Sequence, residues 1–264
     1  MTLIIQRPTG SKLTLLQTWQ PMDPDAAAYI TAVETADGQA LEEKVKFAID
    51  NFVLGCKADG IWSAVKASCI LAGARTLAGA LVPLVGTAPT NYNFVAGDYN
   101  RKTGLVGDGS TKYLNANRNN NADPQNNKHL AAFVSSVGAL ANSPFISNNT
   151  PGSGRSFISA TIQATINRSV LSQLSAPDAS TLVGASRQNS SELVVRANTA
   201  STVFTGASSE APSDSPLHIY RREYADDQWS ASRLAFYSIG ESLDLALLDA
   251  RVTDLINAFG AAIP

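Results

Sequence analysis

The sequence predicts a mainly β protein, an antiparallel β-sandwich or jelly roll with an N-terminal helical module and a C-terminal helix. From residue 87 onward, short β-prone runs recur roughly every 8–25 residues with turn residues between them, which is typical of such sandwiches. Residues 23–76 show helical periodicity instead. The predicted organisation is an attachment arm at 1–20, a helical module at 21–86, and a sandwich with its closing helix at 87–264.

The composition excludes some classes of function. Of the 264 residues, 44% are apolar, which is enough for a core, and only 16% are charged, with a net charge of −2. Nucleic-acid binding needs a concentrated basic surface, so no nucleic-acid partner is expected. No stretch reaches the eighteen or so uncharged apolar residues of a membrane span, so no membrane insertion is expected.

The N-terminus and the cysteines indicate a cytosolic origin. Residues 1–8 hold a run of three apolar residues before Arg7 and Pro8, unlike a signal peptide. Cys56 and Cys69 are the two cysteines. We interpret them as buried thiols of a protein made in a reducing cytosol, with a disulfide as the alternative.

The arm at 1–20 predicts two short strands joined by a turn. Its β-prone runs at 3–5 and 13–16 flank turn residues at 8–11. Two such strands cannot bury a face by themselves, so we expect the arm to pack on another protein by strand addition. The residues expected to make that contact are Leu3, Ile4, Ile5, Leu13 and Leu15.

Three helices are expected to follow the arm. Asp23 and Pro24 form a typical helix start, and that helix should end near Gly38. The second helix should stop at Gly55, since its apolar residues recur at spacings of three and four, at Leu41, Val45, Ala48, Ile49 and Phe52. The nearly all-apolar run at 61–74 is predicted to be a third, buried helix.

Nine runs are predicted to form the strands of the sandwich. The runs at 217–220 and 233–237 alternate as half-buried strands do. The stretch at 115–127, in which seven of thirteen residues are asparagine, predicts an exposed loop. The predicted strand runs are 104–106, 112–114, 129–137, 156–162, 182–186, 192–196, 202–205, 217–220 and 229–238.

The chain should close with a helix. Ser238 and Glu241 have the spacing of a capping box, and Gly260 marks the end. We expect this helix to pack on the body of the domain, with a partner-binding helix as the alternative. Its apolar stripe is Leu248, Val252, Leu255, Ile256 and Phe259.

The sequence offers no clear catalytic or metal site. His129 and His218 each lie in a β-prone run, and no nucleophile elbow accompanies them. Zinc-site spacing is absent, so no metal and no cofactor is predicted, although Asp98, Asp108 and Asp123 leave calcium as an alternative. No pair of acids suited to glycoside hydrolysis stands out in the strand region, so we expect no enzyme activity.

Aromatic residues near a charged loop are the best candidates for ligand binding. A ring face stacks well on the apolar face of a sugar, and Tyr220, Tyr224 and Trp229 cluster around the loop at 221–227. The alternative is that Trp229 belongs to the core and the loop is a solvated turn.

Three stretches carry a resemblance to known proteins. Residues 23–30, DPDAAAYI, with 36–42, ADGQALE, resemble a helical module of structural proteins of tailed bacteriophages, cyanophages among them. Residues 103–114, TGLVGDGSTKYL, resemble the early hairpin of concanavalin A-like, or laminin G-like, sandwiches. Residues 233–243, RLAFYSIGESL, resemble the last strand and following helix of such domains in phage virion proteins.

The resemblance implies a virion structural protein, made in the cytoplasm of the bacterial host, with a tail-fibre or baseplate role in host-surface attachment. It implies other virion proteins and a host-surface glycan as partners. It also implies a homo-oligomer, with a trimer as the favoured number. The alternative is a capsid decoration or purely architectural virion protein that binds no ligand. A glycan-cleaving depolymerase would need the acid pair that is missing above.

Overall fold

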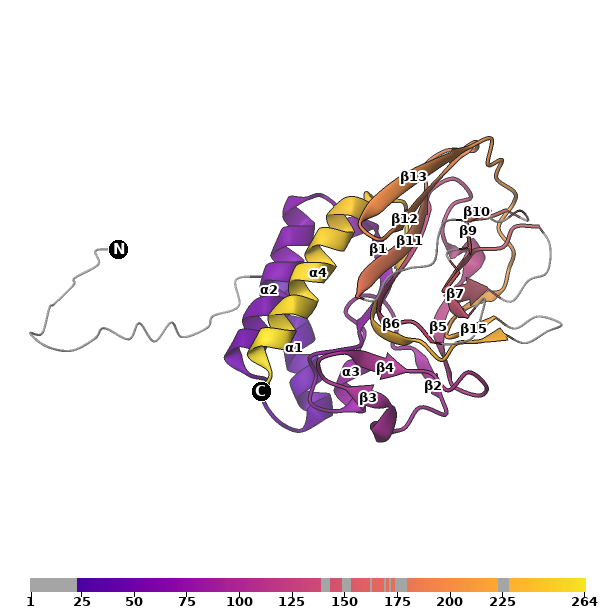
Figure 1. Cartoon of the computed structure of the whole chain (residues 1–264). Coiled ribbons are helices and arrows are strands. Elements are labelled where there is room, and N and C mark those ends of the chain that lie inside the picture. The colour runs from indigo at the N-terminus through magenta and orange to yellow at the C-terminus, as the bar shows by residue number, and fades with distance from the viewer. Residues whose placement is uncertain are drawn as a thin grey trace, which may run out of the picture.

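Two large antiparallel β-sheets, a small two-stranded sheet and a layer of helices make up the described part of the protein (Figure 1). The computed structural model describes residues 23–138, 143–148, 153–161, 163–168, 170, 172–173, 180–222 and 228–264. The attachment arm at 1–20 and Tyr224 lie outside the described residues. The predicted fold class, a mainly β sandwich with N-terminal helices and a C-terminal helix, is confirmed.

The larger sheet, sheet A, has eight strands, and its centre is the pair of β6 and β17. Strand β1 pairs with β17 beside the main path, whose order is β13-β12-β11-β6-β17-β4-β3. The strands of sheet A are β1 (Val65–Ile70), β3 (Tyr99–Asn100), β4 (Gly104–Val106), β6 (Lys128–Ser136), β11 (Thr181–Arg187), β12 (Glu192–Ala197), β13 (Ala200–Thr205) and β17 (Arg233–Gly240).

The smaller sheet, sheet B, has seven strands in the order β10-β9-β8-β7-β14-β5-β2. A separate two-stranded sheet is formed by β15 (Arg221–Arg222) and β16 (Gln228–Trp229). The strands of sheet B are β2 (Thr90–Tyr92), β5 (Tyr113–Asn119), β7 (Pro144–Asn148), β8 (Phe157–Ser159), β9 (Gln163–Thr165), β10 (Ser172–Gln173) and β14 (Pro216–Ile219).

The helices cover one face of sheet A, and sheet B covers the other (Figure 1). The helices are α1 (Pro24–Asp37), α2 (Glu43–Ala58), the short α3 (Leu77–Ala80) and α4 (Leu245–Ala262). One core therefore joins the helices to sheet A and includes Phe52, Phe236, Leu248, Val252 and Phe259. The other lies between the sheets and includes Leu105, Leu130, Val134, Ile146 and Ile219.

The first two helices form largely as the sequence predicts. The Asp23 carboxylate caps α1 by accepting the backbone N–H of Asp25 at 2.9 Å, and Gly38 ends the helix with φ of 68°. The predicted stop of α2 at Gly55 is wrong, because the helix continues to Ala58. Gly55 serves close packing instead, since a Cβ there would lie 2.8 Å from Cδ of Arg251 on α4.

The third predicted helix, over residues 61–74, is wrong: its centre is strand β1. β1 pairs antiparallel with β17, with Cys69 opposite Tyr237. Its side chains alternate between the two cores, with Val65 and Ile70 under the helices and Ala67 and Cys69 between the sheets. A strand buried on both faces has a continuous apolar run, which periodicity does not distinguish from a buried helix.

The C-terminal helix packs on the body, as predicted, but its cap differs. Asp244 caps α4 by accepting the N–H of Ala246 at 2.7 Å, whereas Ser238 is a buried residue of β17. The predicted stripe faces the core, except that Ile256 is half-buried. The helix approaches β11 so closely that a Cβ on Gly184 would lie 2.8 Å from Cδ2 of Leu245.

Both cysteines are buried and free, as the thiol interpretation expects. Burial raises the pKa of Cys56 and of Cys69 to about 12. Among the described helices, none has the length and apolar character to cross a membrane.

His129 lies inside sheet A, where burial lowers its pKa to about 4. Its Nδ1 lies 2.5 Å from the carbonyl oxygen of Glu241, which only accepts, so Nδ1 carries the proton. The neutral ring then accepts the hydroxyl hydrogen of Ser238 at Nε2, over 2.8 Å. The fold therefore needs an uncharged imidazole at this position.

We expect the unfolding free energy to fall on acidification because of this histidine. The unfolded chain takes up the proton near pH 6.5 and the folded chain near pH 4, so stability is lost as the pH falls through this window, by about 3 kcal/mol. Urea unfolding of the wild type and of His129→Gln between pH 7 and 4 tests this. The variant is less stable at pH 7, and the gap should narrow at pH 4. A gap that stays constant over this range contradicts the prediction.

Candidate functional site

Tyr92, Tyr113, His218, Arg221 and Trp229 form one contiguous group, here called the aromatic cluster. Tyr92 and Tyr113 face each other on the paired strands β2 and β5, and their rings stack at 4.2 Å with 5° between planes. The Tyr113 ring also contacts His218 at 5.0 Å and meets Trp229 edge-on at 5.8 Å. Tyr113 is thus the centre of the cluster.

The cluster lies on the outer face of sheet B because of strand alternation. On β14, Leu217 and Ile219 point into the core between the sheets, so His218 points away from it. On β5, Leu114 is in the same core, and Tyr113 alternates to the other side, where its ring contacts His218, although it also packs against residues of that core. The alternation that the sequence shows at 217–220 therefore places the cluster on the side away from sheet A.

Arg221 supplies the charge of the cluster. Its Cζ lies 4.8 Å from the Tyr113 ring centre and 4.7 Å from the Trp229 ring centre, so the guanidinium contacts both rings. The antiparallel pairing of Arg221 with Trp229 in the small sheet holds this geometry. Burial, and secondarily Arg221, lowers the pKa of His218 to about 4, so this imidazole is neutral at pH 7.

The cluster offers apolar ring surface next to groups that form hydrogen bonds. Tyr92 is 39% exposed, and Tyr113, Arg221 and Trp229 are half-buried. His218 is only 4% exposed, and its buried Nδ1 has no hydrogen-bond partner among the described residues, so the polar groups at the surface are those of Arg221 and the tyrosines. Exposed ring surface with polar groups at its border suits the stacking of a sugar.

The structure separates two of the residues that the sequence groups together. Trp229 belongs to the cluster, but Tyr220 is fully buried, and its hydroxyl donates to the carbonyl of Leu105 at 2.5 Å. The positive φ of Tyr220, 73°, turns the chain between β14 and β15 so that the ring packs on Phe94 in the core. Tyr220 is therefore not available to a surface ligand, which corrects that part of the prediction.

Sequence reasoning missed Tyr92, Tyr113 and Arg221 as partners of Trp229. Tyr92 meets Tyr113 through the pairing of β2 with β5. The local sequence does not show which strands pair with each other, so it gave no indication that these two tyrosines are neighbours. Arg221 could have been found, since it and Trp229 flank the same predicted loop.

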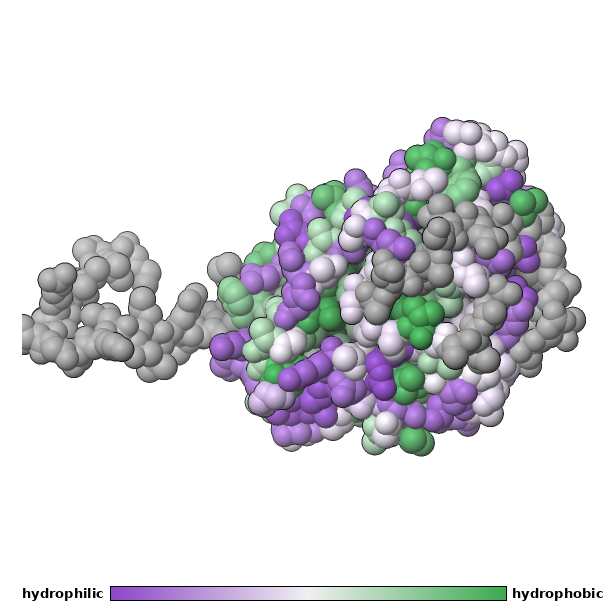
Figure 2. All heavy atoms as spheres, in the orientation of Figure 1, coloured by the Kyte–Doolittle hydropathy of each residue, from purple (hydrophilic) through white to green (hydrophobic). Residues whose placement is uncertain are grey.

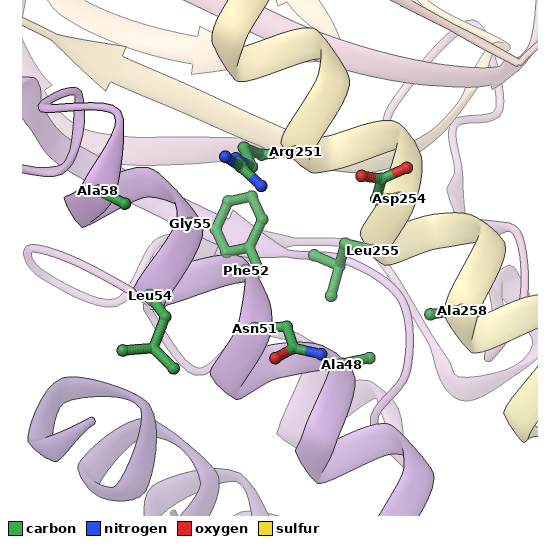
Figure 3. Close-up of a pocket in the computed structure, with 10 residues that line it drawn as sticks. All are labelled: Ala48, Asn51, Phe52, Leu54, Gly55, Ala58, Arg251, Asp254, Leu255 and Ala258. Atoms are coloured by element: carbon green, nitrogen blue, oxygen red, sulfur yellow. The ribbon is translucent and has the colours of Figure 1, made fainter. Parts of the chain in front are cut away.

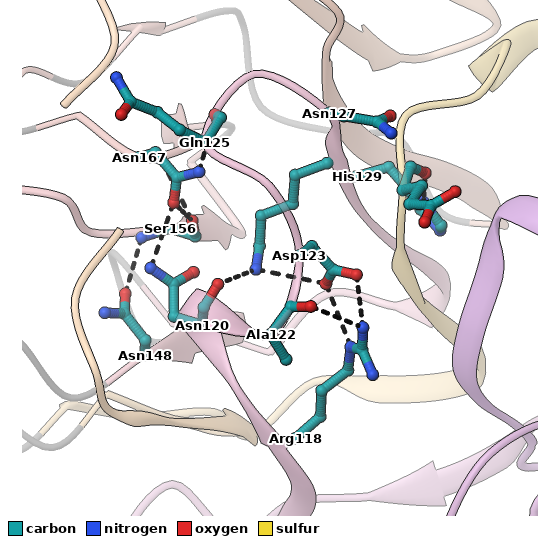
Figure 4. Close-up of polar contacts among 12 residues, drawn as sticks. Arg118, Asn120, Ala122, Asp123, Gln125, Asn127, His129, Asn148, Ser156 and Asn167 are labelled. Carbon is teal, nitrogen blue, oxygen red and sulfur yellow. Dashed lines mark hydrogen bonds and ion pairs between the residues drawn. The ribbon is translucent and has the colours of Figure 1, made fainter. Parts of the chain in front are cut away.

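A second concentration of polar groups is buried at one end of the sheets (Figure 4). Lys128 is fully buried, and its Nζ donates to the carbonyl of Asn120 at 2.6 Å and lies 3.6 Å from the carboxylate of Asp123. Arg118 donates two N–H hydrogen bonds to the same carboxylate, at 2.5 and 3.1 Å. Burial lowers the pKa of Lys128 to about 8, an effect that Asp123 opposes.

Asparagine side chains extend this buried network across several loops. Asn120 donates to the carbonyl of Gly154 at 2.8 Å, and Asn167 donates to that of Gln125 at 2.9 Å. Asn148 accepts the backbone N–H of Ser156 at 2.7 Å. We interpret the network as structural, because these amide groups bond to groups inside the protein, although Oδ1 of Asn120 is buried with no hydrogen-bond partner among the described residues.

The asparagine-rich stretch at 115–127 is therefore not an exposed loop, which corrects that prediction. Its first part is strand β5, followed by a short 3₁₀ turn at 120–122, and both Asn120 and Asp123 are buried. Asparagine composition alone does not reveal that the amides are used as internal hydrogen-bond donors and acceptors.

The acids considered for calcium are engaged separately. Asp108 accepts the backbone N–H groups of Ser110 and Lys112 within its own turn, and hydrogen bonds hold its pKa far below the usual range despite partial burial. Asp98 pairs with Lys112 at 2.6 Å. Within the described residues, no group of three or more histidine, cysteine or acidic side chains could hold a metal ion.

No protein-family model and no curated protein matches this sequence. Among solved structures, the chain is similar to domain 4 of the extracellular arabinanase AbnA from Geobacillus stearothermophilus, with 12% identity over 65% of this chain and 82% of that one and a TM-score of 0.42. It is also similar to the enzymatically active domain of tailspike protein 2 of bacteriophage CBA120, with 14% identity over 65% and 30% of the two chains and a TM-score of 0.40.

A third similar structure is a mutant Trypanosoma rangeli sialidase displaying trans-sialidase activity, with 11% identity, 79% and 39% coverage, and a TM-score of 0.48. This chain therefore spans under half the length of the tailspike and sialidase chains. At identities and TM-scores this low, the likenesses carry no inference about what the chain binds.

We expect Asp123→Asn to destabilise the protein by about 3–5 kcal/mol, because it leaves the buried Lys128 and Arg118 facing no carboxylate. The loss should be largest below pH 8 and smaller above it, where Lys128 gives up its proton. Chemical unfolding at pH 7 and pH 9.5 measures both effects. The matched control is Asp214→Asn, an exposed acid that accepts from Asn119, with an expected change within about 0.5 kcal/mol. Equal small losses for both variants would contradict the structural role.

Proposed function

We propose that this chain is a structural protein of a tailed-phage virion, a tail-fibre or baseplate component that attaches to a host-surface glycan through the aromatic cluster. The observation that carries the proposal is the aromatic cluster on the outer face of sheet B, in which Tyr113 contacts both Tyr92 and Trp229 and Arg221 lies over the Tyr113 and Trp229 rings. The resemblance of residues 23–30 with 36–42, and of residues 233–243, to phage virion proteins supports the virion assignment.

The proposed activity is binding without bond cleavage. No acidic side chain among the described residues belongs to the aromatic cluster, whereas glycoside hydrolysis needs two opposed carboxyl groups. A homo-oligomer, with a trimer as the proposed number, would present several clusters to one surface, so weak contacts would add up. No cofactor and no metal is part of the proposal.

The division of the chain is also part of the proposal. The arm at 1–20, with Leu3, Ile4, Ile5, Leu13 and Leu15, would attach the protein to another virion component by strand addition. The helical module at 21–86 and the sandwich at 87–264 would then carry the aromatic cluster outward.

We expect saturable binding on a glycan array, weakened at least about tenfold by Trp229→Ala and by Tyr113→Ala, which equals about 1.4 kcal/mol. The control is Trp62→Ala, a half-buried tryptophan on the helical side whose Nε1 donates to Asp25 at 3.2 Å. It should bind as the wild type does. A blank array would favour the capsid decoration or architectural role, and full binding by Trp229→Ala would move the site elsewhere.

We expect deletion of residues 1–20 to abolish incorporation into virions while the remaining chain folds, since it keeps Asp23, which caps α1. Quantification of the protein in purified particles measures this. Trp229→Ala, which leaves the arm intact, should be incorporated normally. Unchanged incorporation of the deletion variant would end the attachment role of the arm.

A further inference from the structure

A surface groove of about 610 Å³ lies between α2 and α4 (Figure 3). Its walls are built from small residues of both helices, namely Ala48, Gly55 and Ala58 on α2 and Ala258 on α4. Its floor is apolar because it is formed by Phe52 and Leu255, two buried side chains that are 4% and 2% exposed. Small walls over an apolar floor leave room for the side chains of another segment.

The outer face of α4 is poor in charge for a helix that faces water. Two of its three charged residues are used internally: Asp249 pairs with Arg196 at 2.7 Å, and Arg251 pairs with Asp59 on α2, also at 2.7 Å. The third, Asp254, is exposed at the groove and has no hydrogen-bond or ion-pair partner among the described residues. A solvated helix normally carries a charged outer face, so the groove has the character of a covered surface.

Apolar side chains continue this surface along both helices. Phe47 on α2 is 51% exposed, and Leu247 on α4 is 37% exposed. Figure 2 shows hydrophobic residues, in green, among the purple ones over the helical layer. The face as a whole therefore offers apolar area for burial.

The chain enters the described structure at the rim of this groove. Asp23, the cap of α1, contacts α2: its carboxylate pairs with Lys57 at 2.8 Å and its N–H donates to Asp50 at 3.2 Å. Asp50, Leu54 and Lys57 are spaced by four and three residues, so they share one face of α2. Leu54 also lines the groove, so the residue before Asp23 starts next to it.

We propose that residues 13–22 of the same chain occupy the groove between α2 and α4. This segment is rich in apolar residues, namely Leu13, Leu15, Leu16, Trp19 and Met22. Residues 13–22 carry no charged side chain, so the segment can lie on the apolar floor of the groove without burying a charge. Ten residues reach up to about 33 Å, whereas α2 rises only about 15 Å from Ala48 to Ala58, so the segment spans the groove easily.

This placement of residues 13–22 in the groove goes beyond the proposed function and does not depend on it. It leaves Leu3, Ile4 and Ile5 outside the groove. Under the proposed function, a virion partner would compete with the groove for Leu13 and Leu15.

Hydrogen–deuterium exchange of the full chain tests whether residues 13–22 occupy the groove. We expect the amides of residues 13–22 to exchange at least about tenfold more slowly than those of an unstructured peptide. Ala258→Arg, which fills the groove and adds a positive charge, should remove this protection. Ala250→Arg is the matched control, an exposed alanine of α4 outside the groove lining, and should keep it. Asn51→Arg, at an exposed groove position of α2, repeats the test if Ala258→Arg misfolds.

Three results would overturn the proposal. Unprotected amides at 13–22 in the wild type would leave the groove to another occupant. Protection that both groove variants retain would place the segment elsewhere. Protection that grows with protein concentration would assign the groove to the arm of a second copy.

Discussion

The burial of sheet A on both faces is the constraint on which the rest of the structure depends. The central strands β6 and β17 carry side chains for two cores, one under the helices and one against sheet B. Several polar groups within this layer are buried and bond to other groups of the same layer. His129 bonds to Ser238, and Ser68 donates to the carbonyl of Tyr237 at 2.7 Å. The helical layer and sheet B therefore both pack on the same sheet, sheet A.

The burial of sheet A on both faces separates the groove between α2 and α4 from the aromatic cluster. Because α2 and α4 cover one face of sheet A and sheet B covers the other, the outer faces of the helices and of sheet B point in opposite directions (Figure 1). The groove is on the helical side, where residue 23 enters, and the aromatic cluster is on the other side. The chain's entry point and the cluster are therefore kept apart by the whole thickness of the sandwich.

The parts of this architecture that were predictable are those decided by local chemistry. The cap of α1 by Asp23 and the stripe of α4 follow from residues within one or two helical turns. β1 was missed because its run is apolar on both faces, so strand and helix leave the same pattern. The buried role of Asn120 was missed because its partners, such as Gly154, come from remote loops.

The candidate site was half predictable for the same reason. Trp229 was found because a tryptophan beside a charged loop is a local signal. Tyr220 was misplaced because one positive φ turns its ring into the core, and neighbouring residues do not reveal such a backbone angle. Tyr113 was missed because its role depends on cross-strand partners.

The shape of the aromatic cluster decides what kind of binding it suits. Tyr113 has one face on Tyr92 and its border on Trp229 and His218, so little of its own surface is left for a ligand. A ligand would meet mainly the exposed parts of Tyr92 and Trp229, a small area over a rigid base. Rigid rings lose little entropy on binding, but a small area gives a weak single contact. Firm attachment by such a site requires several copies that act together. The proposed function therefore depends on the proposed homo-oligomer.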